Sequence, residues 1–179
     1  MTTHTLSVLV ENKPGVLANV AGLFSRRAFN ITSLTVGPTA DERVSRMTIV
    51  VDGASTPVDQ VHKQLEKLVR VLKVVELDED AAVERELALI KVAVQPDRRA
   101  ELLDVAASFR ANVVDMDADT IVLEAVCSPG RLESLLAKLD GHGTCELVRS
   151  GMLAIARGSG TITDTSTNIE NSPRQAIPA

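Results

Sequence analysis

Residues 11–36 read ENKPGVLANVAGLFSRRAFNITSLTV, and this stretch decides the fold. Pro14 is typical of a first helical turn, where its missing N–H removes no helix hydrogen bond. From about Gly15 to Ala28, apolar residues recur at every third or fourth position, which predicts an amphipathic helix lying on a sheet. The stretch therefore predicts the end of a strand, a tight loop, a helix and a second strand.

The start of the predicted helix has the features of a carboxylate-binding site. Gly15 has no Cβ, so a ligand can approach the backbone closely. We expect the N–H groups of Gly15, Val16 and Leu17 in the first turn, where backbone donors have no acceptor within the helix. Such a turn favours a bound negative charge.

Two asparagines, each with a side-chain amide, flank this helix in the sequence, one before it and one after it. Asn12 precedes it, and Asn30 opens the strand that follows. With the apolar Val16, Leu17 and Ile31 nearby, these amides suit a small aliphatic zwitterion. On the residues alone, the alternative is that Asn12 caps the helix and Asn30 makes a turn.

The elements around the helix have the order βαββαβ. Residues 5–10 alternate, which predicts a strand with one buried face. A second helix opened by Pro57 has apolar residues along one side. The remaining strands are expected at residues 30–37, 47–51 and 71–77.

The same order then recurs in the second half of the chain. Helices are expected over residues 98–110 and from Pro129 onward. We expect the strands at residues 87–94, 113–116, 120–126 and 146–148, with a short apolar segment at 152–156 behind the last. The second unit has no glycine at its first helix start, so we expect any ligand site of this kind in the first unit.

The sequence therefore predicts an α+β protein of two ferredoxin-like βαββαβ units. We divide the chain into a first unit at 1–78, an acidic linker at 79–86, a second unit at 87–157 and a polar, disordered tail at 158–179.

Composition argues against several classes of function. The net charge is −5, and the chain has three Phe, no Trp and no Tyr, which disfavours binding of nucleic acid. No apolar segment approaches the roughly 20 residues of a membrane span. We interpret Cys127 and Cys145 as buried thiols of a protein in the reducing cytoplasm.

No catalytic or metal site is predicted. His4, His62 and His142 are far apart in the sequence and are expected at the surface or in turns. The alternating Asp115, Asp117 and Asp119 lack the rest of a calcium loop and fit a hairpin turn better. Without an active site, binding or regulation is favoured over catalysis.

A run of basic residues lies along the second predicted helix and just past its end. Lys63, Lys67, Arg70 and Lys73 recur at steps of three and four. The usual interpretation is a solvated face, and the alternative is docking onto an acidic partner.

Residues 14–24, PGVLANVAGLF, resemble an ACT domain, a small-molecule sensor of amino-acid metabolism. The longer string at 6–39, followed by SRMTIVV at 45–51 and VERELALIKV at 83–92, resembles the regulatory small subunits of acetolactate synthase (acetohydroxyacid synthase). The resemblance extends from residue 4 to about 157 and includes RSGMLAIARG at 149–158.

This resemblance implies a subunit with no catalytic site and no cofactor of its own. It would bind and activate a separate catalytic subunit carrying thiamine diphosphate, Mg²⁺ and FAD, in branched-chain amino-acid biosynthesis, and confer feedback inhibition by valine. The family holds its amino acid between two chains of an ACT homodimer. The effector-binding positions carried over are Asn12, Gly15, Val16 and Leu17 on the helix-start side, and Asn30 and Ile31 on the side contributed by the partner chain.

Two rival functions make different demands on the sequence. An ACT module serving another enzyme or a transcription regulator is one alternative, and a regulator would need a helix-turn-helix unit and a basic face. A stand-alone enzyme would need clustered acid, base or metal-binding residues.

Overall fold

A computed structural model of the chain describes residues 3–53 and 57–162. Its regular elements follow in the order β1 (Thr3–Glu11), α1 (Val16–Arg26), β2 (Ile31–Pro38), β3 (Val44–Asp52), α2 (Val58–Leu65), β4 (Val71–Leu77), β5 (Ala82–Ala93), η1 (Pro96–Arg98), α3 (Arg99–Phe109), β6 (Asn112–Met116), β7 (Thr120–Cys127), α4 (Pro129–Leu139), η2 (Asp140–His142) and β8 (Thr144–Ala156).

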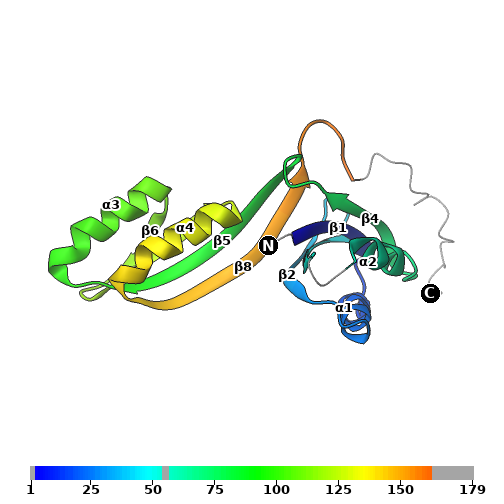
Figure 1. Ribbon diagram of the computed structural model, residues 1–179, viewed down its shortest axis with the longest axis horizontal. Helices are drawn as coiled ribbons and strands as arrows, with labels where there is room; N and C mark the ends of the chain where they lie inside the picture. The colour runs from blue at the N-terminus through cyan, green and yellow to red at the C-terminus, as the bar shows by residue number, and fades with distance from the viewer. Residues whose placement is uncertain (1–2, 54–56, 163–179) are drawn as a thin grey trace, which may run out of the picture.

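The strands form two antiparallel sheets of four strands each (Figure 1). The first has the order β2-β3-β1-β4 and the second the order β6-β7-β5-β8. With their helices, both units have the βαββαβ order, which confirms the predicted α+β, ferredoxin-like fold. The division at residues 79–86 stays a prediction, although residues 82–86 of the expected linker belong to β5. The expected tail lies outside the described residues from residue 163 onward.

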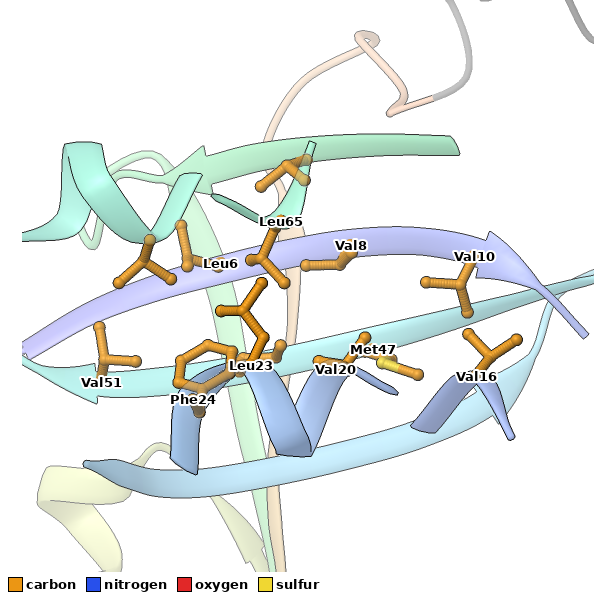
Figure 2. Packing of buried hydrophobic residues seen from close by; sticks show 13 residues of the cluster. Leu6, Val8, Val10, Val16, Val20, Leu23, Phe24, Met47, Val51 and Leu65 are labelled. Carbon is orange, nitrogen blue, oxygen red and sulfur yellow. The ribbon is translucent and has the colours of Figure 1, made fainter. Parts of the chain in front are cut away.

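The core of the first unit lies between its sheet and its two helices (Figure 2). Leu6, Val8 and Val10 alternate along β1 and all point to the helix side of the sheet. These residues pack against side chains from the two helices, namely Val16, Val20, Leu23 and Phe24 of α1 and Leu65 of α2. The spacing of apolar residues in the sequence therefore identified this buried face of α1, except for Leu17, which is 45% exposed.

The opposite face of β1 is also buried, so the prediction of one buried face is wrong. Thr5, Ser7 and Leu9 lie on that face, and each is at most 6% exposed. The cause is a long ribbon made by β5 and β8, which continues beyond the end of β7 and reaches the first sheet (Figure 1). Thr5 Oγ1 donates to Glu84 Oε1 of this ribbon at 3.2 Å.

The ribbon also corrects the predicted strand bounds. β5 begins at Ala82 rather than at residue 87, and the two apolar pieces expected at 146–148 and 152–156 are one strand, β8. Ser150 and Gly151 of β8 lie opposite Leu87 alone, so the apparent break in the sequence is a β-bulge.

The positions of single side chains confirm some predictions and correct others. Cys127 is buried as expected, and burial raises the pKa of its thiol, but Cys145 is exposed on β8, so the second expected buried thiol is wrong. His142 is the last residue of the short 3-10 helix η2 and is buried, so the expectation of a surface or turn position is wrong for this residue. The turn between β6 and β7 contains Asp117 and Asp119, as the hairpin interpretation predicted.

Candidate effector site at the start of helix α1

Gly15 is the residue immediately before α1, and its backbone is left-handed, with φ 84° and ψ −10°. This conformation favours glycine because a Cβ would crowd the following carbonyl. A Cβ added at Gly15 would meet no atom within 4 Å, so the backbone borders open space. The start of the helix is therefore accessible to a ligand.

Two of the three expected donors are free. Among the described residues, the N–H groups of Gly15 and Leu17 have no hydrogen-bond acceptor. The N–H of Val16 donates to the carbonyl oxygen of Lys13, but at 3.4 Å this bond is long. A carboxylate at this turn would meet two unused donors and one weakly engaged donor.

Asn12 does not cap α1, because no side-chain hydrogen bond is made at the helix start. Instead its Nδ2 donates to the carbonyl oxygen of Glu42 at 2.8 Å, and its backbone N–H donates to the carbonyl oxygen of Arg43 at 2.7 Å. Both bonds tie the β1–α1 loop to the β2–β3 loop. They leave Oδ1 of Asn12 available as an acceptor.

The β2–β3 loop is itself held by an ion pair. Nη2 of Arg43 lies 2.6 Å from Oδ2 of Asp41, and the backbone N–H of Arg43 donates to Oδ1 of Asp41. The hydrogen bonds from Arg43, first from its side chain and then from its backbone, lower the pKa of Asp41 to about 2. Sequence reasoning missed this support, although the Asp-x-Arg spacing is a visible signal for it.

The apolar residues of the predicted site divide into two groups. Val16 is 3% exposed and belongs to the core, so only its backbone can face a ligand. Leu17 is 45% exposed and is available beside Gly15. Ile31 is half-buried and packs its side chain partly against the same core.

One chain does not bring the two asparagines together. Gly15 precedes α1, whereas Asn30 follows it and is exposed. A helix of 11 residues is about 16 Å long, which exceeds the reach of a small amino acid. If both ends take part in one site, the second end must come from another chain.

Beside the helix start is a cavity of about 230 Å³. It is lined by Val16, Asn19 and Val20 of α1 and by residues 67–71, which follow α2. Lys63, Lys67 and Arg70 are exposed near this end of the first unit. Their docking onto an acidic partner stays a prediction.

The described residues contain neither a cluster that could hold a metal nor a helix that could span a membrane. No group of three or more His, Cys, Asp or Glu side chains across residues 3–53 and 57–162 is placed to hold a metal ion. No helix in these ranges combines the length and the apolar character needed to cross a bilayer.

Comparison with known proteins identifies the family. Residues 6–73 match the family model described as the AHAS small subunit-like ACT domain, and residues 85–158 match the model described as the small subunit of acetolactate synthase. The acetolactate synthase small subunit of Mycobacterium bovis is 52% identical over 156 residues, which cover 87% of this chain and 93% of the relative.

More distant relatives agree. The probable acetolactate synthase small subunit of Archaeoglobus fulgidus is 48% identical, over 87% of this chain and 98% of its own length. The crystal structure of the small subunit from Thermotoga maritima superposes with a TM-score of 0.81 at 36% identity, covering 89% of this chain and all of that one. The chain belongs to the acetolactate synthase small-subunit family, as a regulatory subunit built on an ACT domain.

Proposed function

We propose that this chain binds the catalytic large subunit of acetolactate synthase, raises its activity and makes it sensitive to valine. The chain contributes no chemistry and holds no cofactor. Thiamine diphosphate, Mg²⁺ and FAD belong to the catalytic partner, which joins two 2-oxo acids in branched-chain amino-acid biosynthesis.

The main support for a valine site is the accessible start of α1. Its free donors at Gly15 and Leu17 fit a carboxylate, and they lie at the positive end of the helix dipole. The Oδ1 of Asn12 accepts from the ammonium group, because Nδ2 is already used by Glu42. Leu17 supplies apolar surface for the side chain.

The site is completed by a second copy of the chain. Asn30 and Ile31 of the partner supply a further amide and an apolar wall, because the length of α1 keeps the chain's own Asn30 away. β2, which begins at Ile31, is an edge strand of its sheet and has backbone groups available for pairing. An isologous dimer then contains two equivalent sites.

Regulation requires that valine bind one arrangement of this dimer more tightly than another. Valine affinity must then change when the catalytic subunit binds, and by the same factor as valine changes subunit binding. A pocket of this kind binds valine, leucine and isoleucine with affinities that differ only modestly, because one methylene contributes about 1–3 kcal/mol to discrimination.

Reconstitution tests the proposal directly. The purified catalytic subunit is assayed for acetolactate formation alone and with this chain, across a range of valine concentrations. We expect the chain to raise the rate and valine to lower it only when the chain is present. The proposal fails if the chain leaves the rate unchanged, or if valine inhibits the catalytic subunit equally well without it.

The alternative is an ACT module that senses an amino acid for a different enzyme or for a transcription regulator. In that case the chain would bind valine but would neither activate nor co-purify with the catalytic subunit. The match of residues 85–158 to the small-subunit model favours the first function.

A further inference from the structure

A second cavity lies where the β5–β8 ribbon meets the first sheet. Its volume is about 360 Å³, within the usual range for small-molecule sites, and nine residues line it. They come from the end of β2, from β3, and from the ribbon strands β5 and β8. Met47, Ile49 and Val51 of β3 lie in the core with α1, so Arg46 and Thr48, which alternate with them and line the cavity, are on the face of the first sheet that points away from α1.

Arg46 of β3 is the polar centre of this cavity. Its Nη2 donates to the carbonyl oxygen of Ala154 on β8 at 3.0 Å. Its Nε is buried and has no hydrogen-bond partner in the part of the chain that the structure describes. No carboxylate in that part forms an ion pair with Arg46, and burial lowers the pKa of its guanidinium.

A half-buried charge with an unused donor is unfavourable unless something compensates it. Arg85 also lines the cavity, and neither Asp nor Glu does. The local charge is therefore positive. A bound anion would supply both the missing acceptor and the missing counter-charge.

The rest of the cavity wall is apolar. Val83 of β5 and Leu153 and Ile155 of β8 line it, and the two β8 side chains are 55% and 56% exposed. Leu153 lies opposite Arg85 and Ile155 opposite Val83, so all four side chains share one face of the ribbon. A ligand that covers this wall would remove apolar surface from water.

We propose that this cavity binds a short branched aliphatic acid, with its carboxylate on Arg46 and its hydrocarbon body against Val83, Leu153 and Ile155. A 2-oxo acid fits as well as a simple carboxylic acid. An amino acid fits poorly, because its ammonium group would face two guanidinium groups and no carboxylate.

The cavity spans the contact between the first sheet and the ribbon. Arg46 belongs to the first sheet, whereas its acceptor at Ala154 and the apolar wall belong to the ribbon. A ligand that contacts both the first sheet and the ribbon would stabilise the arrangement in which the two are packed together. This site does not depend on the valine site, which is on the other face of the sheet.

The test is a binding titration of the full chain, by calorimetry, with 3-methylbutanoate and 3-methyl-2-oxobutanoate as probes. Acetate serves as a carboxylate without the hydrocarbon body, and valine reports on the separate site at the start of α1. We expect both branched acids to bind at least roughly tenfold more tightly than acetate, because acetate cannot cover the wall.

Arg46→Met keeps the apolar stem and removes the charge. We expect it to weaken binding of the branched acids by roughly tenfold or more and to leave valine binding unchanged. Arg27→Met is the matched control, because Arg27 is an exposed arginine at the end of α1 whose side chain contacts Gln64. It should bind both acids like the parent chain.

Ile155→Asp is the second variant, for the case that Arg46→Met does not fold. Ile155 is more than half exposed, so the change is tolerated, and its carboxylate would take the place of the ligand's beside Arg46. It should abolish binding of the acids. The proposal is overturned if the branched acids do not bind, if acetate binds equally well, or if a folded Arg46→Met or Ile155→Asp chain binds like the parent.

Discussion

Gly15 determines both the backbone conformation and the chemistry at the start of α1. Its left-handed φ of 84° disfavours other residues, and the space beside it is open. Asp and Asn tolerate this conformation better than most residues and have almost the same shape. Comparing the two at position 15 therefore separates the effect of charge from the effect of size.

We expect Gly15→Asp to abolish valine binding, because its carboxylate would occupy the space proposed for the ligand's own. Gly15→Asn should weaken binding but not abolish it, since it adds bulk without charge. Each lost hydrogen bond to a charged group costs about 1.5–3 kcal/mol, or roughly 10–150-fold in affinity. Calorimetry with valine measures both variants, and circular dichroism checks that both are folded. Parent-like binding by Gly15→Asp would refute this position for the carboxylate.

The lowered pKa of the Asp41 carboxyl group predicts how the stability of the β2–β3 loop depends on pH. Arg43 lowers its pKa in the folded chain to about 2, whereas an unfolded Asp titrates near 3.9. Because the folded pKa is the lower one, the ion pair stabilises the loop fully above about pH 4, and this contribution is lost as the pH falls toward 2. Between pH 5 and 8 Asp41 should contribute no pH dependence.

Carbon-detected NMR of the Asp41 carboxyl measures this titration. The side-chain amide of Asn12, which donates to the neighbouring Glu42, should change over the same pH range. In Arg43→Met the midpoint should return toward about 3.9. A midpoint near 4 in the parent chain would contradict the role of Arg43.

At the scale of single residues, the sequence predicted positions better than contacts. Asn12, Gly15 and Asn30 flank α1 as their order requires, but the hydrogen bond from Asn12 to Glu42 depends on a loop 30 residues away. The core position of Val16 follows from the helical period that also includes Val20. Local patterns fix which residues are near the helix, whereas long-range pairing decides which groups remain free.

At the scale of elements, β8 shows why strand ends were hard to predict. The Ser150-Gly151 pair resembles a turn, and only pairing with β5 makes it a bulge inside one strand. The outer face of β1 carries Thr5 and Ser7, which suggest a solvated surface, yet the ribbon covers both. The spacing of residues within one strand does not predict the bulge or this burial, because both depend on pairing and contact between distant parts of the chain.

Gly151 lies at the contact between β8 and β2, where an added side chain should disturb the packing. An added Cβ would be 3.0 Å from Ser33 Oγ and from Thr35 Oγ1 on β2. Both hydroxyls bond to the backbone of Met152 on β8. Ser33 Oγ accepts from the N–H of Met152 at 2.8 Å, and Thr35 Oγ1 donates to the carbonyl oxygen of Met152 at 2.7 Å. A side chain at position 151 would therefore separate the ribbon from the first sheet.

We expect Gly151→Ala to lower the free energy of unfolding by about 1–2 kcal/mol for its left-handed backbone and by roughly 1–3 kcal/mol more for the contact. Gly158→Ala is the matched control, since Gly158 has the same φ of 81° but no atom near an added Cβ. Thermal unfolding compares the two, and hydrogen exchange at the Met152 amide reports the local contact. Equal effects at both positions would show that the β2–β8 contact is not tight.

At the scale of the whole molecule, the length of α1 determines how many chains a valine site needs. α1 lies between Gly15 and Asn30 and is about 16 Å long, so we propose that one chain offers two half-sites rather than one complete valine site. In a two-fold dimer each half-site would meet the complementary half of the other chain. This arrangement makes ligand binding sensitive to how the two chains are placed, which is the requirement for allosteric control.

Mixing two inactive variants tests whether the site is shared. A Gly15→Asp chain keeps its Asn30 half, and an Asn30→Ala chain keeps its Gly15 half. Homodimers of either variant should bind valine weakly or not at all. Refolding them together in equal amounts makes half of the dimers mixed, and each mixed dimer contains one intact site, so about a quarter of the parent's binding capacity should return at parent-like affinity. Calorimetry measures this capacity, and recovery of none would mean that each site lies within a single chain.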